Sequence, residues 1–140
     1  MPRFLVDFFP NVANYWDIFL TALTATYQMF FIAGLITLLI GGAFGISLIV
    51  TKTDGIKPNR IIHFILEVIT NMFRAVPFII LLIFLIPLTR SIAGTSIGVK
   101  GAVVPLVFGA VPFYTRQVET ALADVNPGKI EAARSMGSST

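Results

Sequence analysis

The amino-acid sequence predicts an all-α membrane protein with three transmembrane helices and one short helix outside the bilayer. Of the 140 residues, 56% are hydrophobic and only 12% are charged, and the mean hydropathy is +0.87. Soluble domains carry about 25% charged residues, so a soluble fold of this length could not bury so much apolar surface. In addition, the apolar residues form three long segments separated by short polar stretches.

The residue content excludes several kinds of function. The chain has no cysteine and a single histidine, His63, which excludes disulfides, thiolate catalysis and cysteine or histidine metal clusters. The ten basic residues are spread along the chain and the formal net charge is only +3, which favours loop and lipid contacts over a nucleic-acid surface. Because neither a nucleophile–base pair nor a GxxxxGK[ST] phosphate loop is present, we expect no catalytic residue, metal site or cofactor on this chain.

The first spanning helix is predicted over residues 18–50. Asp17 is the last charged residue before Lys52, and the strongest apolar run covers residues 29–50. At a rise of 1.5 Å per residue this run forms a helix about 33 Å long, enough to cross a hydrocarbon core of about 30 Å. The longer uncharged segment indicates that the helix begins outside the bilayer or crosses it at a tilt.

Three glycines of this segment are predicted to mediate helix packing. Gly41 and Gly45 have the GxxxG spacing, and Gly34 lies on nearly the same helical face. Small residues at this spacing let two helix backbones approach closely in lipid. The partner is either another helix of this chain or a second subunit. We favour the former, because glycine is common in membrane helices generally.

The second spanning helix is predicted over residues 64–88, and it is not uniform along its length. Residues 76–88 are apolar but too few to cross a bilayer alone, so the residues before them must enter the membrane or its interface. Pro77 and Pro87 are expected to kink this helix or to mark its ends, because proline lacks the backbone N–H that a helix interior needs.

Ionisable side chains in this segment are the first candidates for function, because such residues are costly inside a membrane. Arg74 precedes the apolar run and is, with Pro77, a candidate for the translocation path or its gating. The alternative for Arg74 is a long side chain that reaches the lipid headgroups. For Glu67 and His63 the sequence favours an ordinary position at the membrane interface.

The third spanning helix is predicted over residues 101–123. Pro105 and Pro112 lie on one helical face, so their kinks bend the helix in one direction. Arg116 and Glu119, near the end of this helix, have the i, i+3 spacing of a local ion pair.

The basic residues predict the orientation in the membrane. In a three-span chain, the loop at residues 51–60 and the tail after the third span lie on the same side. That side holds six basic residues and the other side three: Lys52, Lys57, Arg60, Arg116, Lys129 and Arg134 against Arg3, Arg90 and Lys100. Because cytoplasmic loops are enriched in lysine and arginine, the N-terminus is predicted outside and residue 140 in the cytoplasm.

A short helix outside the bilayer is predicted over residues 127–137. Asn126 is a favourable N-cap, and Pro127 is a favourable first helical residue. Gly137 is well placed to end the helix in a left-handed conformation. One face of this helix carries Ile130, Ala133, Met136 and Gly137.

The sequence of this tail resembles the EAA motif of ATP-binding-cassette importer permeases. Glu131, Ala132 and Ala133 form the Glu-Ala-Ala triplet, and Gly137 follows after three further residues. In that family the motif forms a cytoplasmic coupling helix that docks on the ATPase subunit. The resemblance therefore implies that six residues contact an ATPase: Ile130, Glu131, Ala132, Ala133, Met136 and Gly137.

Six further segments resemble the permeases of methionine importers in particular. They are residues 71–82, 86–90, 94–98, 102–106, 112–113 and 116–119. The resemblance as a whole covers about residues 15–140. In the family the motif continues with an Ile-x-Leu-Pro element and two more membrane helices, so we expect residues 1–140 to be one incomplete permease domain.

The resemblance implies transport across the bacterial inner membrane. The chain would form half of a permease homodimer that works with two copies of an ATPase subunit and an extracytoplasmic substrate-binding protein. ATP hydrolysis is expected on the separate ATPase, and substrate is expected to cross by alternating access. Two alternatives stay open: a permease for another amino acid, and a small membrane protein that anchors a partner without transport.

Overall fold

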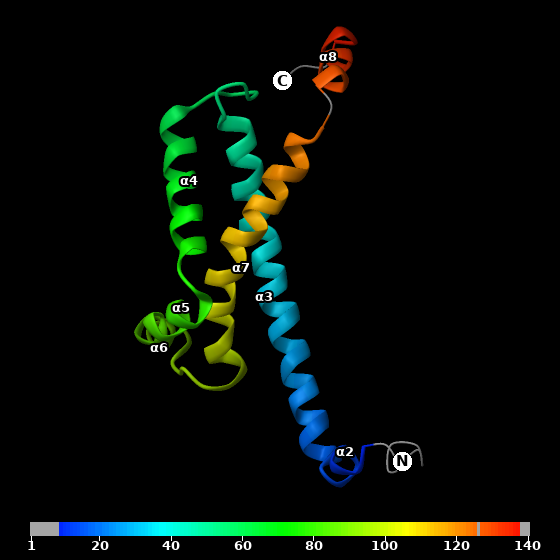
Figure 1. The fold of residues 1–140 in the computed structure, drawn as a ribbon, viewed down its shortest axis with the longest axis vertical. Coiled ribbons are helices and arrows are strands. Elements are labelled where there is room, and N and C mark those ends of the chain that lie inside the picture. The colour runs from blue at the N-terminus through cyan, green and yellow to red at the C-terminus, as the bar shows by residue number, and fades with distance from the viewer. Residues whose placement is uncertain (1–8, 126, 138–140) are drawn as a thin grey trace.

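The computed structural model describes residues 9–125 and 127–137, and every regular element in these ranges is a helix (Figure 1). In chain order the helices are α2 (Pro10–Asn14), α3 (Trp16–Thr51), α4 (Arg60–Ala75), α5 (Phe78–Phe84), α6 (Ile86–Ala93), α7 (Gly98–Ala123) and α8 (Pro127–Ser135). The predicted all-α fold is thereby confirmed.

The helices are arranged around a contact between α3 and α7. Helix α3 runs along much of the long axis, and its N-terminal half extends beyond the other helices (Figure 1). Helix α7 crosses α3 and packs along its C-terminal half, and α4 packs against both. Helix α8 lies beyond the end of α7, at the same end of the molecule as the α3–α4 connection (Figure 1).

Among the described residues, two single helices are long and apolar enough to cross a membrane: α3 with 36 residues and α7 with 26. Helices α4 and α5 meet the same criterion only together, and they are bent by 102° at the break between them. Large apolar side chains cover the outside of α3; Phe30 and Leu39, for example, are 68% and 63% exposed. Since a water-soluble protein rarely exposes so much apolar surface, these helices are suited to lipid.

The second predicted span, residues 64–88, is a single helix in the prediction but three helices in the structure. Helix α4 ends before Val76, which adopts an extended backbone with φ −85° and ψ 125°, and α5 begins after Pro77. A residue before proline is disfavoured in the helical region, and Pro77 has no N–H for the preceding turn. Pro87 lies in the first turn of α6, where the missing N–H does no harm. The predicted helix ends at the two prolines are confirmed, whereas the prediction of one continuous helix over residues 64–88 is wrong.

The first and third predicted spans correspond to α3 and α7. Helix α7 begins at Gly98, a few residues before the predicted start at residue 101. It stays one helix although Pro105 and Pro112 both lie inside it. Both prolines are buried, so they face the protein interior rather than lipid.

Helices α3 and α7 approach closely along the glycine face of α3. A Cβ atom at Gly45 would lie 2.6 Å from Cβ of Val118 and 2.8 Å from the carbonyl oxygen of Thr115. A Cβ atom at Gly41 would come within 3.0 Å of a side chain of α7. At Gly34 it would have no such neighbour within 4 Å. Of the three glycines predicted for packing, Gly41 and Gly45 thus lie at the α3–α7 contact and Gly34 lies away from it.

Candidate functional site

Helix α8, which carries the Glu-Ala-Ala triplet, stands apart from the other helices (Figure 1). Glu131 and Ala132 are exposed, Ala133 is half-buried, and Met136 is 84% exposed. Gly137 follows the helix with φ +84°, the left-handed conformation predicted for it. The side chain of Ile130 lies outside the described part of the structure. The helix therefore exposes Glu131, Ala132 and Met136 to the surroundings.

A second group of polar side chains connects α4 to α7. The Nη2 atom of Arg116 donates a hydrogen bond to Oδ1 of Asn71 at 3.0 Å and lies 3.5 Å from Oε1 of Glu67. The Nη1 atom pairs with the carboxylate of Glu119, which confirms the local ion pair expected from the spacing. The Nε2 atom of His63 lies 3.8 Å from Oε2 of Glu67. We call these five side chains the Arg116 network.

The Arg116 network also reaches α3. The Nδ1 atom of His63 lies 3.1 Å from the carbonyl oxygen of Leu48. Because a carbonyl oxygen only accepts, Nδ1 carries the proton in this contact. His63, Glu67 and Asn71 follow one another at intervals of four residues on α4, so they share one helical face. That face joins all three long helices at the end of the molecule nearest α8.

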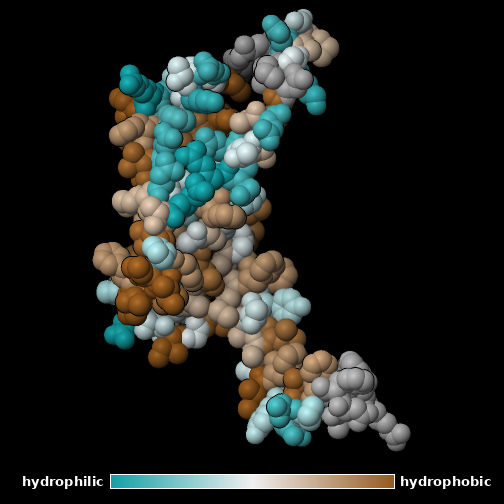
Figure 2. Space-filling view, viewed as in Figure 1, coloured by the Kyte–Doolittle hydropathy of each residue, from teal (hydrophilic) through white to brown (hydrophobic). Residues whose placement is uncertain are grey.

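The charges of the network are only partly shielded from the surroundings. The side chains of Arg116 and Glu119 are 23% and 16% exposed, and that of Glu67 is 42% exposed. The guanidinium of Arg116 thus forms ion pairs with the carboxylates of both Glu67 and Glu119. Figure 2 shows hydrophilic residues gathered over α4 and the C-terminal half of α7, above a largely hydrophobic lower part. Charged residues of membrane proteins gather at the lipid–water interface, and the interfacial position of Glu67 stays a prediction.

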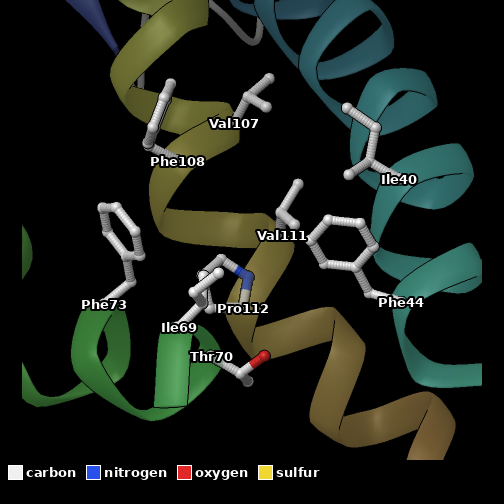
Figure 3. Close-up of a pocket in the computed structure, with 9 residues that line it drawn as sticks. All are labelled: Ile40, Phe44, Ile69, Thr70, Phe73, Val107, Phe108, Val111 and Pro112. Carbon is white, nitrogen blue, oxygen red and sulfur yellow. The ribbon is translucent and has the colours of Figure 1, made fainter. Parts of the chain in front are cut away.

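An apolar cavity of about 250 Å³ lies between α3, α4 and α7 (Figure 3), and its lining residue Thr70 directly precedes Asn71 of the Arg116 network in the chain. Its lining is aliphatic and aromatic apart from one hydroxyl: Ile40, Phe44, Ile69, Thr70, Phe73, Val107, Phe108, Val111 and Pro112. The rings of Phe73 and Phe108, on α4 and α7, have their centroids 5.7 Å apart. An amino-acid zwitterion would leave both its charges without partners here, so the cavity does not suit that class of ligand.

The two residues predicted for the translocation path lie at the break between α4 and α5. Arg74 is exposed in the last turn of α4, and Pro77 precedes the first residue of α5. In the described ranges Arg74 has no ion pair or side-chain hydrogen bond. Neither residue belongs to the Arg116 network.

Comparison with known proteins places this arrangement in a family. Residues 41–140 match the family model described as "Binding-protein-dependent transport system inner membrane component". The match covers most of the chain and includes both the Arg116 network and α8. The chain belongs to this family. Membership and the apolar helices together make it a multi-pass membrane protein.

Individual members of the family are similar over much of the chain. The D-methionine transport system permease proteins MetI of Yersinia pestis, Salmonella typhimurium and Escherichia coli are each 46% identical over 112 residues, which is 80% of this chain and 52% of the relative. One solved structure, of inward-facing conformations of the MetNI methionine ABC transporter, matches 86% of this chain and 56% of its own with TM-score 0.81 and 43% identity. The chain spans about half the length of the curated relatives it matches.

The contacts of Arg116 with α4 in the Arg116 network were not predicted from the sequence. The Arg116–Glu119 pair was expected, but its extension to Glu67 and Asn71 was not. A usable signal was present: three polar residues at four-residue spacing, starting at His63, within an otherwise apolar stretch. That face needed a polar partner on another helix.

Proposed function

We propose that this chain is part of the membrane-spanning permease subunit of an ATP-driven importer of methionine. The observation that carries the proposal is the 46% identity to D-methionine permeases over 80% of the chain. The exposed motif of α8 supports it, because a helix that stands outside the bundle is accessible to a partner subunit.

The proposed partner of α8 is an ATPase subunit, which hydrolyses ATP on its own chain. Glu131, Ala132, Ala133, Met136 and Gly137, together with Ile130, form the docking surface. Two copies of the ATPase would pair with two copies of the permease, and a substrate-binding protein would deliver methionine from outside. The exposed face around Gly34 and the projecting half of α3 are available for the second permease copy.

The proposed mechanism is alternating access driven through α8. Closure of the ATPases displaces α8, and the displacement reaches α7, because only three residues of the chain separate Ala123 of α7 from Pro127 of α8. Helix α7 carries it across the membrane as one continuous helix. Arg74 and Pro77 lie where α4 gives way to α5, so a change of the 102° bend would alter the translocation path near them.

The substrate is tested by uptake into cells that lack their own methionine transport. The complete permease that contains this chain is expressed with its ATPase and binding protein, and uptake of labelled D- and L-methionine is measured against an excess of other amino acids. We expect uptake that requires the ATPase and that unlabelled methionine suppresses most strongly. Stronger suppression by a different amino acid would contradict the substrate, and ATPase-independent or absent uptake would contradict the importer.

The orientation is tested by cysteine labelling, since the chain has no cysteine of its own. Single cysteines at Asp54, Lys129 and Thr95 are probed with a membrane-impermeant thiol reagent in intact cells. The excess of basic residues predicts labelling at Thr95 only, with Asp54 and Lys129 reacting after the membrane is opened. Labelling of position 129 from outside would overturn both the orientation and the docking of α8 on a cytoplasmic ATPase.

A further inference from the structure

Arg116 is the polar contact between α4 and α7 within the described ranges. Its Nη1 atom is held by Glu119 on its own helix, while Nη2 reaches Asn71 and Glu67 on α4. The ion pair within α7 limits the rotamers of the arginine, so the second nitrogen is held in position for the neighbouring helix. The guanidinium therefore acts as a directional link between two helices.

The rest of the α4–α7 contact is apolar and incomplete. The cavity of about 250 Å³ removes van der Waals contacts between the helices beside the network, where Thr70 and Pro112 form part of its wall (Figure 3). The hydrophobic effect has no preferred direction, so it specifies the position of one helix along another less sharply than a polar contact does. Hydrogen bonds and ion pairs weaken steeply when their geometry changes. Arg116 therefore adds a directional constraint to the apolar packing of α4 against α7.

The location of Arg116 along α7 gives this link a consequence for transport. It lies about two helical turns before Ala123, where α7 ends and the connection to α8 begins. We propose that Arg116 is a positioning residue that makes α4 move together with α7 when α8 is displaced. The inference rests on the proposed function. It explains how movement of α8 reaches the break between α4 and α5, because this break is not part of α7 and needs a link from α7 to α4.

The test measures coupling rather than activity alone. In proteoliposomes with the complete transporter, the ratio of methionine imported to ATP hydrolysed is compared between the parent and three variants: Arg116→Gln, Glu67→Gln and Asn71→Leu. We expect ATP hydrolysis to continue while this ratio falls about three- to tenfold in Arg116→Gln and less in the other two. Arg116→Lys should give a ratio between those of the parent and Arg116→Gln. Lysine keeps the positive charge but cannot bond partners on both helices through two separate nitrogens. Arg60→Gln, which removes an exposed arginine of α4 that has no ion pair within the described ranges, is the matched control and leaves the ratio unchanged.

A second readout does not depend on methionine. Spin labels on cysteines at Val68 of α4 and Gln117 of α7, both exposed, report the distance between these helices. A narrow distance distribution in the parent and in Arg60→Gln should broaden or shift in Arg116→Gln and in Glu67→Gln. An unchanged distribution in folded variants would overturn the inference, as would an unchanged import ratio. If the parent transporter imports no methionine but Arg116→Gln still broadens the distance distribution, the proposed function is rejected and the role of Arg116 is retained.

Discussion

Gly45→Leu is expected to separate α3 from α7 and to abolish the folded, transporting permease. Even the Cβ atom of alanine would lie 2.6 Å from Cβ of Val118 and 2.8 Å from the carbonyl oxygen of Thr115. The backbone oxygen cannot move aside without moving α7 itself. Gly45→Ala should therefore lower the free energy of unfolding by about 1–3 kcal/mol, and the larger leucine should lower it further.

Gly42 provides the matched control for this prediction. It is a glycine of the same helix, and its Cβ position has no such neighbour within 4 Å. Gly42→Ala should be neutral or stabilise by up to about 1 kcal/mol, because alanine has a smaller entropy loss than glycine in a helix. Thermal unfolding of the purified permease in detergent measures both variants. Equal stability of Gly45→Ala and Gly42→Ala would show that α3 and α7 do not pack at this face.

Gly137→Val and Glu131→Lys, made in the complete permease, are expected to leave insertion intact but to remove most of the uptake. Gly137 has φ +84°, and a β-branched side chain disfavours this conformation by roughly 1–2 kcal/mol, so the end of α8 must change direction. Glu131 is exposed on α8, and lysine there reverses the charge offered to the ATPase. Neither residue lies in the packed contacts of α3, α4 and α7, so we expect the variants to lose binding of the ATPase rather than folding stability.

Co-purification with the ATPase and uptake of labelled methionine measure the docking defect. Gly137→Asn is the control for the backbone, because asparagine tolerates the left-handed region better than valine does. Lys129→Gln is the control for charge on the same helix, since Lys129 is exposed and lies outside the predicted docking residues. Normal retention of the ATPase and normal uptake in both Gly137→Val and Glu131→Lys would leave α8 as an ordinary surface helix.

Features that depend on neighbouring residues in the chain were determined by the sequence itself. The helix end at Pro77, the left-handed Gly137 and the Arg116–Glu119 pair were all expected and are all found. In each case the cause acts over a few residues: a missing N–H, a missing Cβ atom or a spacing of one helical turn. The apolar content likewise determined the helical membrane fold, because only internally hydrogen-bonded backbone is stable in lipid.

Features that depend on which helix faces which were decided only by the tertiary structure. The glycine pattern did not say that Gly45 meets α7 while Gly34 stays open. Nor did the spacing of charges reveal that Arg116 bonds Asn71, 45 residues away in the chain. The 102° bend likewise exceeds what Pro77 alone requires, since proline ends a helix without setting the direction of the next. Such pairings follow from packing α3, α4 and α7 together, and helical periodicity specifies a face but not its partner.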